Sequence, residues 1–328
     1  MEKQRIGRSD LTISPVGMGC VTFGREIDEE MSLRLLDYAA EHGITFFDTS
    51  EAYGGGNAKA ARKERYDVED TREVSAEMYS SEKILGHWLK RGTRSDCVVC
   101  TKVASGNSPA NIRRQVEASL ERLGVDRIDV YKLHNLDPVV PIDETLDALN
   151  EQVDAGKIGA IGYSNCKPHH LGEALALSRS RGYARFEIIQ VPYSLADRSV
   201  EAELLPLAAR EEISIASYSP LAAGFVTGKY SPTDERQSFP KGSGFDVSPA
   251  HADIYFSDHN FRVIDHLRRK SEELDLPMVR LAMAWAMTNP QITAVLIGAR
   301  KIDHSDNALV AFDVGMDPQL RDEMSAWA

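Results

Sequence analysis

Hydrophobic and polar positions follow two alternating patterns along this chain. Short apolar runs rich in β-branched residues, such as 44–47 and 97–103, are typical of strands that are buried on both faces. Between them, segments such as 29–41 place apolar residues three and four positions apart, and a glycine, here Gly43, often follows. A repeat of strand and helix predicts a parallel α/β sheet covered by helices.

The repeat predicts eight strands, each followed in time by a helix, and therefore a single (β/α)8 barrel domain over residues 1–328. Two apolar runs around a turn at 7–10 predict an N-terminal β-hairpin before it. The first barrel strand ends near Cys20, and the others span 44–47, 97–103, 128–134, 158–163, 186–191, 213–218 and 294–297. The predicted helices span 29–41, 81–90, 109–124, 141–155, 171–181, 201–212, 277–288 and 304–312, with an extra one at 261–274.

A doubly wound sheet is the second interpretation of the same repeat. Such folds usually have a GxGxxG turn after the first strand, and residues 17–22 lack its third glycine. In the barrel interpretation, the two long connections at 54–80 and 221–276 both lie on the C-terminal rim. Long rim loops commonly determine specificity in barrels.

Composition and charge narrow the classes of partner. Hydrophobic residues make up 42% and charged residues 27% of the chain, as in ordinary globular proteins. A net charge of −12 disfavours nonspecific binding to nucleic acid or to anionic membranes. Residues 1–20 lack the apolar core of a signal peptide, and no apolar run is long enough to span a membrane, so we expect a cytoplasmic protein.

The four cysteines do not suggest a metal site. Cys20 and Cys166 are isolated, whereas Cys97 and Cys100 form a CxxC pattern within a predicted strand. Positions three apart on a strand face opposite sides and cannot chelate one ion. We therefore expect small buried residues, and no metal ligand set.

Ionisable side chains follow successive strands. Asp48 and Tyr53 come after the second strand, Lys102 ends the third and His134 ends the fourth. Any one of them alone is more simply explained as a rim ion pair or a structural histidine, but together they indicate one site. A tyrosine near a lysine makes a proton donor, because the ammonium group lowers the tyrosine pKa, and Asp48 could hold that lysine in place.

Motifs along the whole chain resemble those of the aldo-keto reductase family. They lie at 47–54 (FDTSEAYG), 101–103 (TKV), 129–134 (DVYKLH), 156–165 (GKIGAIGYSN), 190–194 (QVPYS), 218–221 (YSPL) and 297–300 (IGAR). The resemblance implies carbonyl reduction with a hydride from a nicotinamide cofactor, usually NADPH/NADP+. In it Tyr53 is the general acid, Lys102 and Asp48 set its acidity, and His134 orients the carbonyl oxygen.

The resemblance also implies a cofactor site. Ser164, Asn165 and Gln190 match residues that hydrogen-bond the nicotinamide amide, and Tyr218 matches the aromatic residue that stacks on its ring. Along the pyrophosphate the matching residues are Ser219, Pro220, Leu221, Gly224 and Lys229. Gly298 and Arg300 belong to the Gly-Ala-Arg motif, in which Arg300 matches the group near the ribose 2′-phosphate. Barrels commonly bind phosphate in the loops after strands seven and eight, which supports this position independently.

Three departures from the family pattern concern the adenine and the substrate. The family often has Gln and then Asn four residues apart on the last barrel helix, where this chain has His304 and Ala308, with Asn307 one residue early. The connection at 54–80 is longer than in typical members. The chain also ends soon after Trp327, which leaves little sequence for a C-terminal substrate loop.

Three functions are compatible with these features. The first is an NADPH-dependent reductase of small-molecule aldehydes or ketones, including sugars and keto-sugars. The second is the reverse reaction, an NAD(P)-dependent sugar or alcohol dehydrogenase. The third is a non-catalytic cofactor-binding regulatory subunit, because the family includes auxiliary proteins of ion channels. The sequence predicts no oligomeric state.

Overall fold

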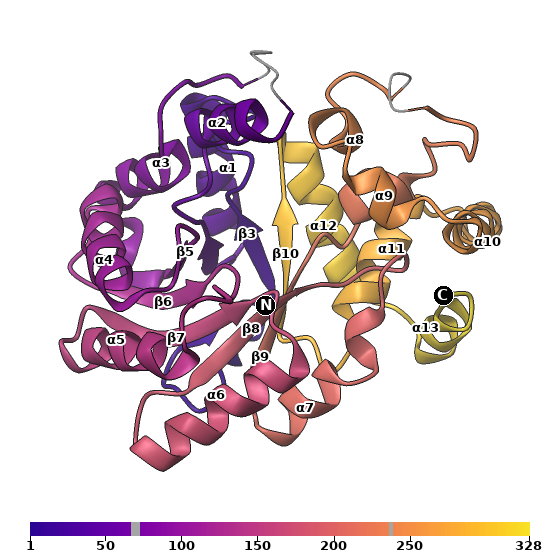
Figure 1. The fold of residues 1–328 in the computed structure, drawn as a ribbon. Coiled ribbons are helices and arrows are strands. Elements are labelled where there is room, and N and C mark those ends of the chain that lie inside the picture. The colour runs from indigo at the N-terminus through magenta and orange to yellow at the C-terminus, as the bar shows by residue number, and fades with distance from the viewer. Residues whose placement is uncertain (67–72, 236–238) are drawn as a thin grey trace.

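The chain folds as a closed barrel of eight parallel strands, which confirms the predicted (β/α)8 architecture (Figure 1). The computed structural model describes residues 1–66, 73–235 and 239–328. The barrel strands are β3 (Val16–Gly19), β4 (Phe46–Asp48), β5 (Val98–Val103), β6 (Ile128–Leu133), β7 (Ile158–Ser164), β8 (Phe186–Pro192), β9 (Ser214–Tyr218) and β10 (Ala294–Gly298). Each strand pairs with the next in sequence, and β10 pairs with β3 to close the sheet.

Helices surround the barrel on its outer side (Figure 1). They are α1 (Glu29–Glu41), α3 (Ser80–Trp88), α4 (Pro109–Leu123), α5 (Ile142–Asp154), α6 (Pro168–Arg181), α7 (Leu204–Arg210), α11 (Met278–Met287) and α12 (Ile302–Val314). Local signals set several boundaries: Asp28 and Ser108 cap the starts of α1 and α4, and Gly124 ends α4 with φ of 65°. Within the described ranges, no helix is long and apolar enough to cross a membrane.

Alternate residues of each strand pack on the two sides of the barrel wall. Val98, Cys100 and Val130 belong to the cluster inside the barrel, whereas Val99 belongs to the layer between strands and helices. Cys97 also lies in that outer layer, so the CxxC cysteines face opposite sides, as predicted. All four cysteines lie in the described ranges, are buried and form no disulfide.

The predicted N-terminal hairpin closes one end of the barrel. It consists of β1 (Gln4–Arg5) and β2 (Thr12–Ile13), which pair antiparallel. Ile6 and Ile13 are fully buried in the interior cluster, and the Gly7 amide donates to Ser214 Oγ at 2.9 Å. The hairpin therefore covers the N-terminal ends of the strands, and the functional groups lie at the opposite ends.

The first long rim connection contains a helix that we did not predict, α2 (Gly55–Tyr66). It starts with two glycines and is mostly polar, so it has no apolar period to detect. Part of the charged stretch lies at 67–72, outside the described residues. Beyond it, the amides of Val74 and Ser75 donate to the carbonyls of Arg25 and Gly24, so this connection packs against the loop that follows β3.

The second long connection carries its own apolar cluster. It contains α8 (Gly244–Val247), α9 (His251–Tyr255) and α10 (Asp258–Leu274). The helix predicted at 261–274 starts earlier, because Ser257 caps it. An aromatic group packs inside the connection, with the rings of Tyr230 and Phe245 stacked at 4.3 Å; its other members are Phe225, Phe239, Tyr255, Phe256 and Phe261. In Figure 1, α2 and α8 both lie at the end toward which the β10 arrow points.

Two predictions near the C-terminus need correction. The helix predicted at 201–212 is a 3₁₀ turn at Ser199–Glu201 followed by the shorter α7. The helix at 304–312 is not the last one, because α13 (Pro318–Ser325) follows, with Asp317 as its cap. Met324 of α13 is fully buried in the same apolar cluster as Phe225, so the end of the chain packs against the second long connection.

Two helical glycines give a matched test of the packing around the barrel. A Cβ on Gly86 of α3 would lie 2.4 Å from the carbonyl oxygen of Arg122 in α4, whereas a Cβ on Gly172 of α6 would meet nothing within 4 Å. We expect Gly86→Ala to destabilise the protein by about 1–3 kcal/mol, because backbone cannot move away cheaply. Gly172→Ala should stabilise it by about 0.5–1 kcal/mol, because alanine favours helix. Denaturant unfolding of both variants measures the two signs, and an unchanged Gly86→Ala stability would contradict close α3–α4 packing.

Candidate active site

Four side chains predicted from the sequence meet at the C-terminal rim of the barrel. Asp48 ends β4, Lys102 lies in β5, and His134 directly follows β6. Lys102 Nζ donates to Asp48 Oδ2 at 2.6 Å and to the Thr49 carbonyl at 2.7 Å. Tyr53 lies over this pair, with its ring centroid 4.7 Å from Lys102 Nζ. The His134 ring meets the Tyr53 ring edge-on, at 5.6 Å between centroids.

The Asp48–Lys102 pair is fully charged although it is buried. Burial alone would raise the pKa of Asp48, but Lys102 and Lys132 outweigh it and hold that pKa well below its usual range. Burial alone would lower the pKa of Lys102, but Asp48 outweighs it and raises that pKa. A permanent positive charge therefore lies beneath the Tyr53 ring.

Two opposing effects set the acidity of Tyr53. Burial raises the pKa of Tyr53 above its ordinary value, and Lys102 opposes that rise. Lys102 therefore acts on the Tyr53 pKa in the expected direction, but desolvation of the phenolate is the larger effect. The phenol keeps its proton at neutral pH, as a proton donor must.

His134 is neutral at neutral pH. Burial, with a further contribution from Lys102, lowers the pKa of His134 to about 3. Its Nδ1 lies 3.0 Å from the hydroxyl of Ser50, which also accepts from the Ala52 amide at 3.2 Å. The same hydroxyl also lies 3.3 Å from the Lys102 carbonyl, so the Ser50–Nδ1 hydrogen bond can run in either direction. In the tautomer in which Ser50 donates to Nδ1, the ring proton is on Nε2, where it can donate to a ligand. We did not predict a role for Ser50, although it lies inside the motif at 47–54.

Gln190 and Ser164 lie next to this site, in buried positions on neighbouring strands. Gln190 Nε2 donates to Asp48 Oδ2 at 3.1 Å, and its Oε1 accepts from Lys132 Nζ at 2.8 Å. Ser164 Oγ donates to the Gln190 carbonyl at 3.3 Å. The Gln190 amide is thus part of the hydrogen-bond network around Asp48. Lys132 was absent from our candidates, although it lies two residues before His134 on the same face of its strand.

Asn165 and Tyr218 join two strand ends across the mouth of the barrel. The Tyr218 hydroxyl donates to Asn165 Oδ1 at 2.8 Å, and Asn165 Nδ2 donates to the His134 carbonyl at 3.0 Å. Asn165 has φ of 57°, a left-handed conformation that is uncommon outside glycine and is often found at functional sites. Both side chains therefore lie beside the His134–Tyr53 pair.

Basic groups gather after β9 and β10. A Cβ on Gly224, which has φ of 89°, would lie 3.1 Å from Lys229 Nζ, so this amine folds back onto its own loop. The Arg300 amide donates to His304 Nδ1 at 3.4 Å, and burial and then Arg300 lower the pKa of both Lys229 and His304. The N-terminus of α12 beside them has no side-chain cap. This combination suits a phosphate group. The segment between β9 and Gly224 holds the other residues predicted along the pyrophosphate, Ser219, Pro220 and Leu221. Gly298 ends β10 in an exposed position.

Two predicted cofactor residues have partners within the protein. Arg300 donates to the Gly242 carbonyl, and its Nε lies 3.7 Å from Glu26 Oε2. Asn307 accepts from Arg280 Nε at 2.9 Å and donates to the Asp303 carbonyl at 2.7 Å. The structure thus brings Arg300 to the basic cluster, whereas it directs Asn307 toward α11.

Comparison with known proteins identifies the family. The model of the aldo/keto reductase family matches residues 15–326. The chain belongs to the aldo/keto reductase family. It is 30% identical to an uncharacterized oxidoreductase, YrpG, of Bacillus subtilis, over 98% of this chain and 94% of that protein. It is also 30% identical to the NADH-specific methylglyoxal reductase of Escherichia coli, over 99% and 98% of the two chains. A probable voltage-gated potassium channel subunit beta of Arabidopsis thaliana is 29% identical, over 96% and 92%.

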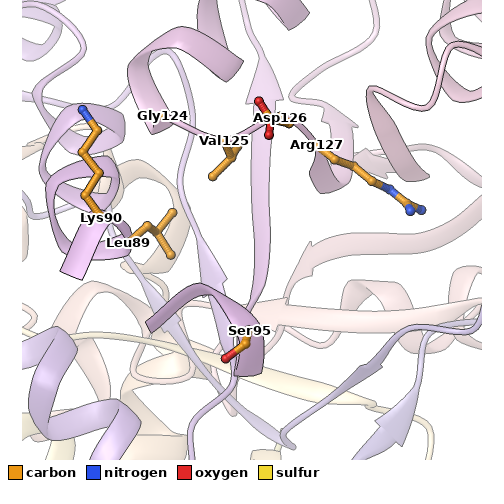
Figure 2. Close-up of a pocket in the computed structure, with 7 residues that line it drawn as sticks. All are labelled: Leu89, Lys90, Ser95, Gly124, Val125, Asp126 and Arg127. Atoms are coloured by element: carbon orange, nitrogen blue, oxygen red, sulfur yellow. The ribbon is translucent and has the colours of Figure 1, made fainter. Parts of the chain in front are cut away.

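A hollow at the N-terminal end of the aldo/keto reductase barrel lies apart from the side chains of the candidate active site. It has a volume of about 500 Å³ and is lined by Leu89, Lys90, Ser95, Gly124, Val125, Asp126 and Arg127. Figure 2 shows the charged ends of Lys90 and Arg127 pointing away from each other. These residues precede β5 and β6, so the hollow is at the N-terminal end of the strands, opposite Tyr53. Across the described residues, no group of three or more His, Cys, Asp or Glu could hold a metal ion.

The lowered pKa of His134 predicts a pH dependence of stability in this aldo/keto reductase. The unfolded histidine titrates at ~6.5, so between that pH and about 3 the unfolded state binds more protons and stability falls as pH falls. From pH 7 to pH 5 we expect His134 to account for a loss of about 1–2 kcal/mol, which His134→Asn removes. Urea unfolding at both pH values measures this. The exposed His259→Asn should keep the parent's pH dependence, and equal slopes in all three proteins would contradict the prediction.

Proposed function

We propose that this protein is an NADPH-dependent oxidoreductase that reduces an aldehyde or ketone to an alcohol, with the proton supplied by Tyr53. The observation that carries the proposal is the arrangement of Tyr53 over the buried Asp48–Lys102 pair, with neutral His134 at its edge. Membership of the aldo/keto reductase family supports an oxidoreductase.

Each protein group has a definite part in the proposed reaction. His134 donates from Nε2 to the carbonyl oxygen and fixes its position beside Tyr53. Tyr53 then gives its proton to that oxygen, and Lys102 stabilises the phenolate that remains. Run in reverse, the same phenolate accepts the proton of an alcohol, so a sugar or alcohol dehydrogenase uses the same residues.

The residues at the rim fit a nicotinamide dinucleotide. Ser164, Asn165 and Tyr218 lie beside the catalytic side chains and would hold the nicotinamide, which supplies the hydride. Lys229, Arg300 and the uncapped end of α12 would hold phosphate groups. The open first turn of this helix and the convergence of three basic groups are the observations that support an anion here.

A non-catalytic regulatory subunit is the second candidate, because the chain is also similar to a probable potassium channel subunit beta. Turnover separates the two. We would follow the absorbance of NADPH and of NADH with methylglyoxal, other aldehydes, keto-sugars and aromatic ketones. Cofactor binding without any turnover across this panel would favour the regulatory subunit.

We also infer that the partner is a small molecule, and that the protein is one cytoplasmic domain over residues 1–328. The net charge of −12 argues against polyanionic partners, and one family match over residues 15–326 supports one domain. Gel filtration and limited proteolysis would test the domain assignment: cleavage into two stable halves would contradict it.

Tyr53→Phe should lower kcat by roughly 10²–10⁴-fold and leave cofactor affinity near its original value, since only the proton donor is lost. Steady-state kinetics and fluorescence titration with NADPH measure the two effects. Tyr183→Phe is the control, because it removes a tyrosine hydroxyl on the outer surface of the protein, where it donates to Asp147. Normal turnover of the Tyr53 variant would mean that another group supplies the proton.

Arg300→Ala should weaken NADPH binding roughly 10- to 100-fold, because a charge-assisted contact contributes ~1.5–3 kcal/mol. NADH lacks the 2′-phosphate, so its affinity should hardly change, and added salt should narrow the difference between the two cofactors in the parent. Arg179→Ala removes the same charge on the outer surface of α6, where this arginine pairs with Glu211, and serves as the control. Equal losses for NADPH and NADH in the Arg300 variant would make Arg300 structural.

A further inference from the structure

Lys132 is a second fully buried lysine at the centre of the barrel. It is the register partner of Lys102 in the β5–β6 pair, so the two lysines lie side by side on neighbouring strands. Lys132 Nζ donates to Asp48 Oδ1 at 3.0 Å and to Gln190 Oε1 at 2.8 Å. The two carboxylate oxygens of Asp48 therefore bind different lysines, and the proposed reaction gives no role to Lys132.

The barrel interior is shaped to hold this side chain. Gly162 of β7 is the register partner of Lys132 on its other side, and a Cβ there would lie 2.7 Å from Lys132 Cγ. The ammonium group also lies 5.3 Å from the centroid of the Phe46 ring, a distance that allows a cation–π contact. The absence of a side chain at Gly162 thus leaves room for Lys132, while the Phe46 ring and two oxygen acceptors surround its ammonium group.

The charges inside the site do not balance in its resting form. Two ammonium groups share one carboxylate, while Tyr53 and His134 are neutral. An unbalanced buried charge is costly, so a group that becomes negative here is stabilised. The groups that act on the Tyr53 pKa or contact its ring include Lys102, Lys132, Asp48, His134 and Tyr218. Asp48 is already paired with the two lysines, and the buried carboxylate Glu51 accepts from the backbone amides of Ala104 and Ser105. The Tyr53 phenolate is then the anion that balances the second ammonium group.

We propose that Lys132 is a positioning residue, which holds Asp48 and Gln190 and gives the site one positive charge beyond the Asp48–Lys102 pair, so that the phenolate form of Tyr53 is neutralised. The inference rests on the proposed function. In the step concerned, the Tyr53 O–H bond breaks, its proton goes to the substrate oxygen as the hydride reaches the carbonyl carbon, and the phenolate stays behind. With Lys132 the buried set then has no net charge, whereas without it one negative charge would be left.

The test replaces Lys132 by Gln, which keeps a polar contact, and by Met, which fills the space without charge. Both should lower kcat about tenfold or more at neutral pH and leave the Kd of NADPH within about twofold. Reduction needs protonated Tyr53. In both variants the pH above which reductase activity is lost should therefore rise by about one unit, which is equivalent to that tenfold change. Lys157→Gln is the charge-matched control, because this half-exposed lysine pairs with Glu117 at the surface.

A second measurement needs no turnover. The ultraviolet tyrosinate signal of the parent minus that of Tyr53→Phe follows Tyr53 alone, and in Lys132→Gln it should also move to higher pH, with circular dichroism checking the fold. A kcat loss with an unmoved pH profile and tyrosinate signal would reduce Lys132 to structural support and overturn the inference. A parent that binds NADPH but turns over no substrate would instead overturn the proposed function, while the tyrosinate measurement would still test Lys132.

Discussion

A single buried carboxylate holds the candidate site together. Asp48 ends a strand of only three residues, and its two oxygens accept from lysines on the next two strands and from the Gln190 amide on β8. If one of these partners were removed, a charged or polar group would be left buried without its partner, which is costly. Asp48, Lys102, Lys132 and Gln190 therefore have to be present together. The position of Tyr53 depends on the same group, since Lys102 lies beneath its ring only while Asp48 and the Thr49 carbonyl hold the ammonium group.

The elements that set the barrel were readable in the sequence because each has a local cause. Apolar β-branched runs such as 98–103 become strands wherever both faces are covered, and caps such as Asp28 and Ser108 fix helix starts within one turn. Strand order then brings Asp48, Lys102 and His134 to one rim. Nothing beyond the count of strands was needed to expect these three side chains near one another.

The parts that were not predictable depend on contacts between distant segments. Helix α2 has no apolar face of its own, and its first turn is fixed by a distant segment, because the Gly56 amide donates to the Glu77 carbonyl. Net pKa values depend on burial, which no motif reports, so the motifs indicated that Lys102 lowers the Tyr53 pKa but not that desolvation outweighs it. Lys132 was missed for a different reason. The period-two alternation through Val130 and His134 already placed it inside the barrel, but a lysine in a strand is usually interpreted as a surface residue.

The aromatic cluster of the second rim connection joins this part of the rim to the outer helices of the barrel. Phe225, Tyr230 and Phe245 pack on one another, and the same buried cluster includes Trp285 of α11 and Met324 of α13. The same connection also reaches the basic groups, because the Gly242 carbonyl accepts from Arg300. Close packing transmits strain, so a change of side-chain volume in α11 or α13 is felt at the rim beside Arg300 although no residue of the rim itself is altered.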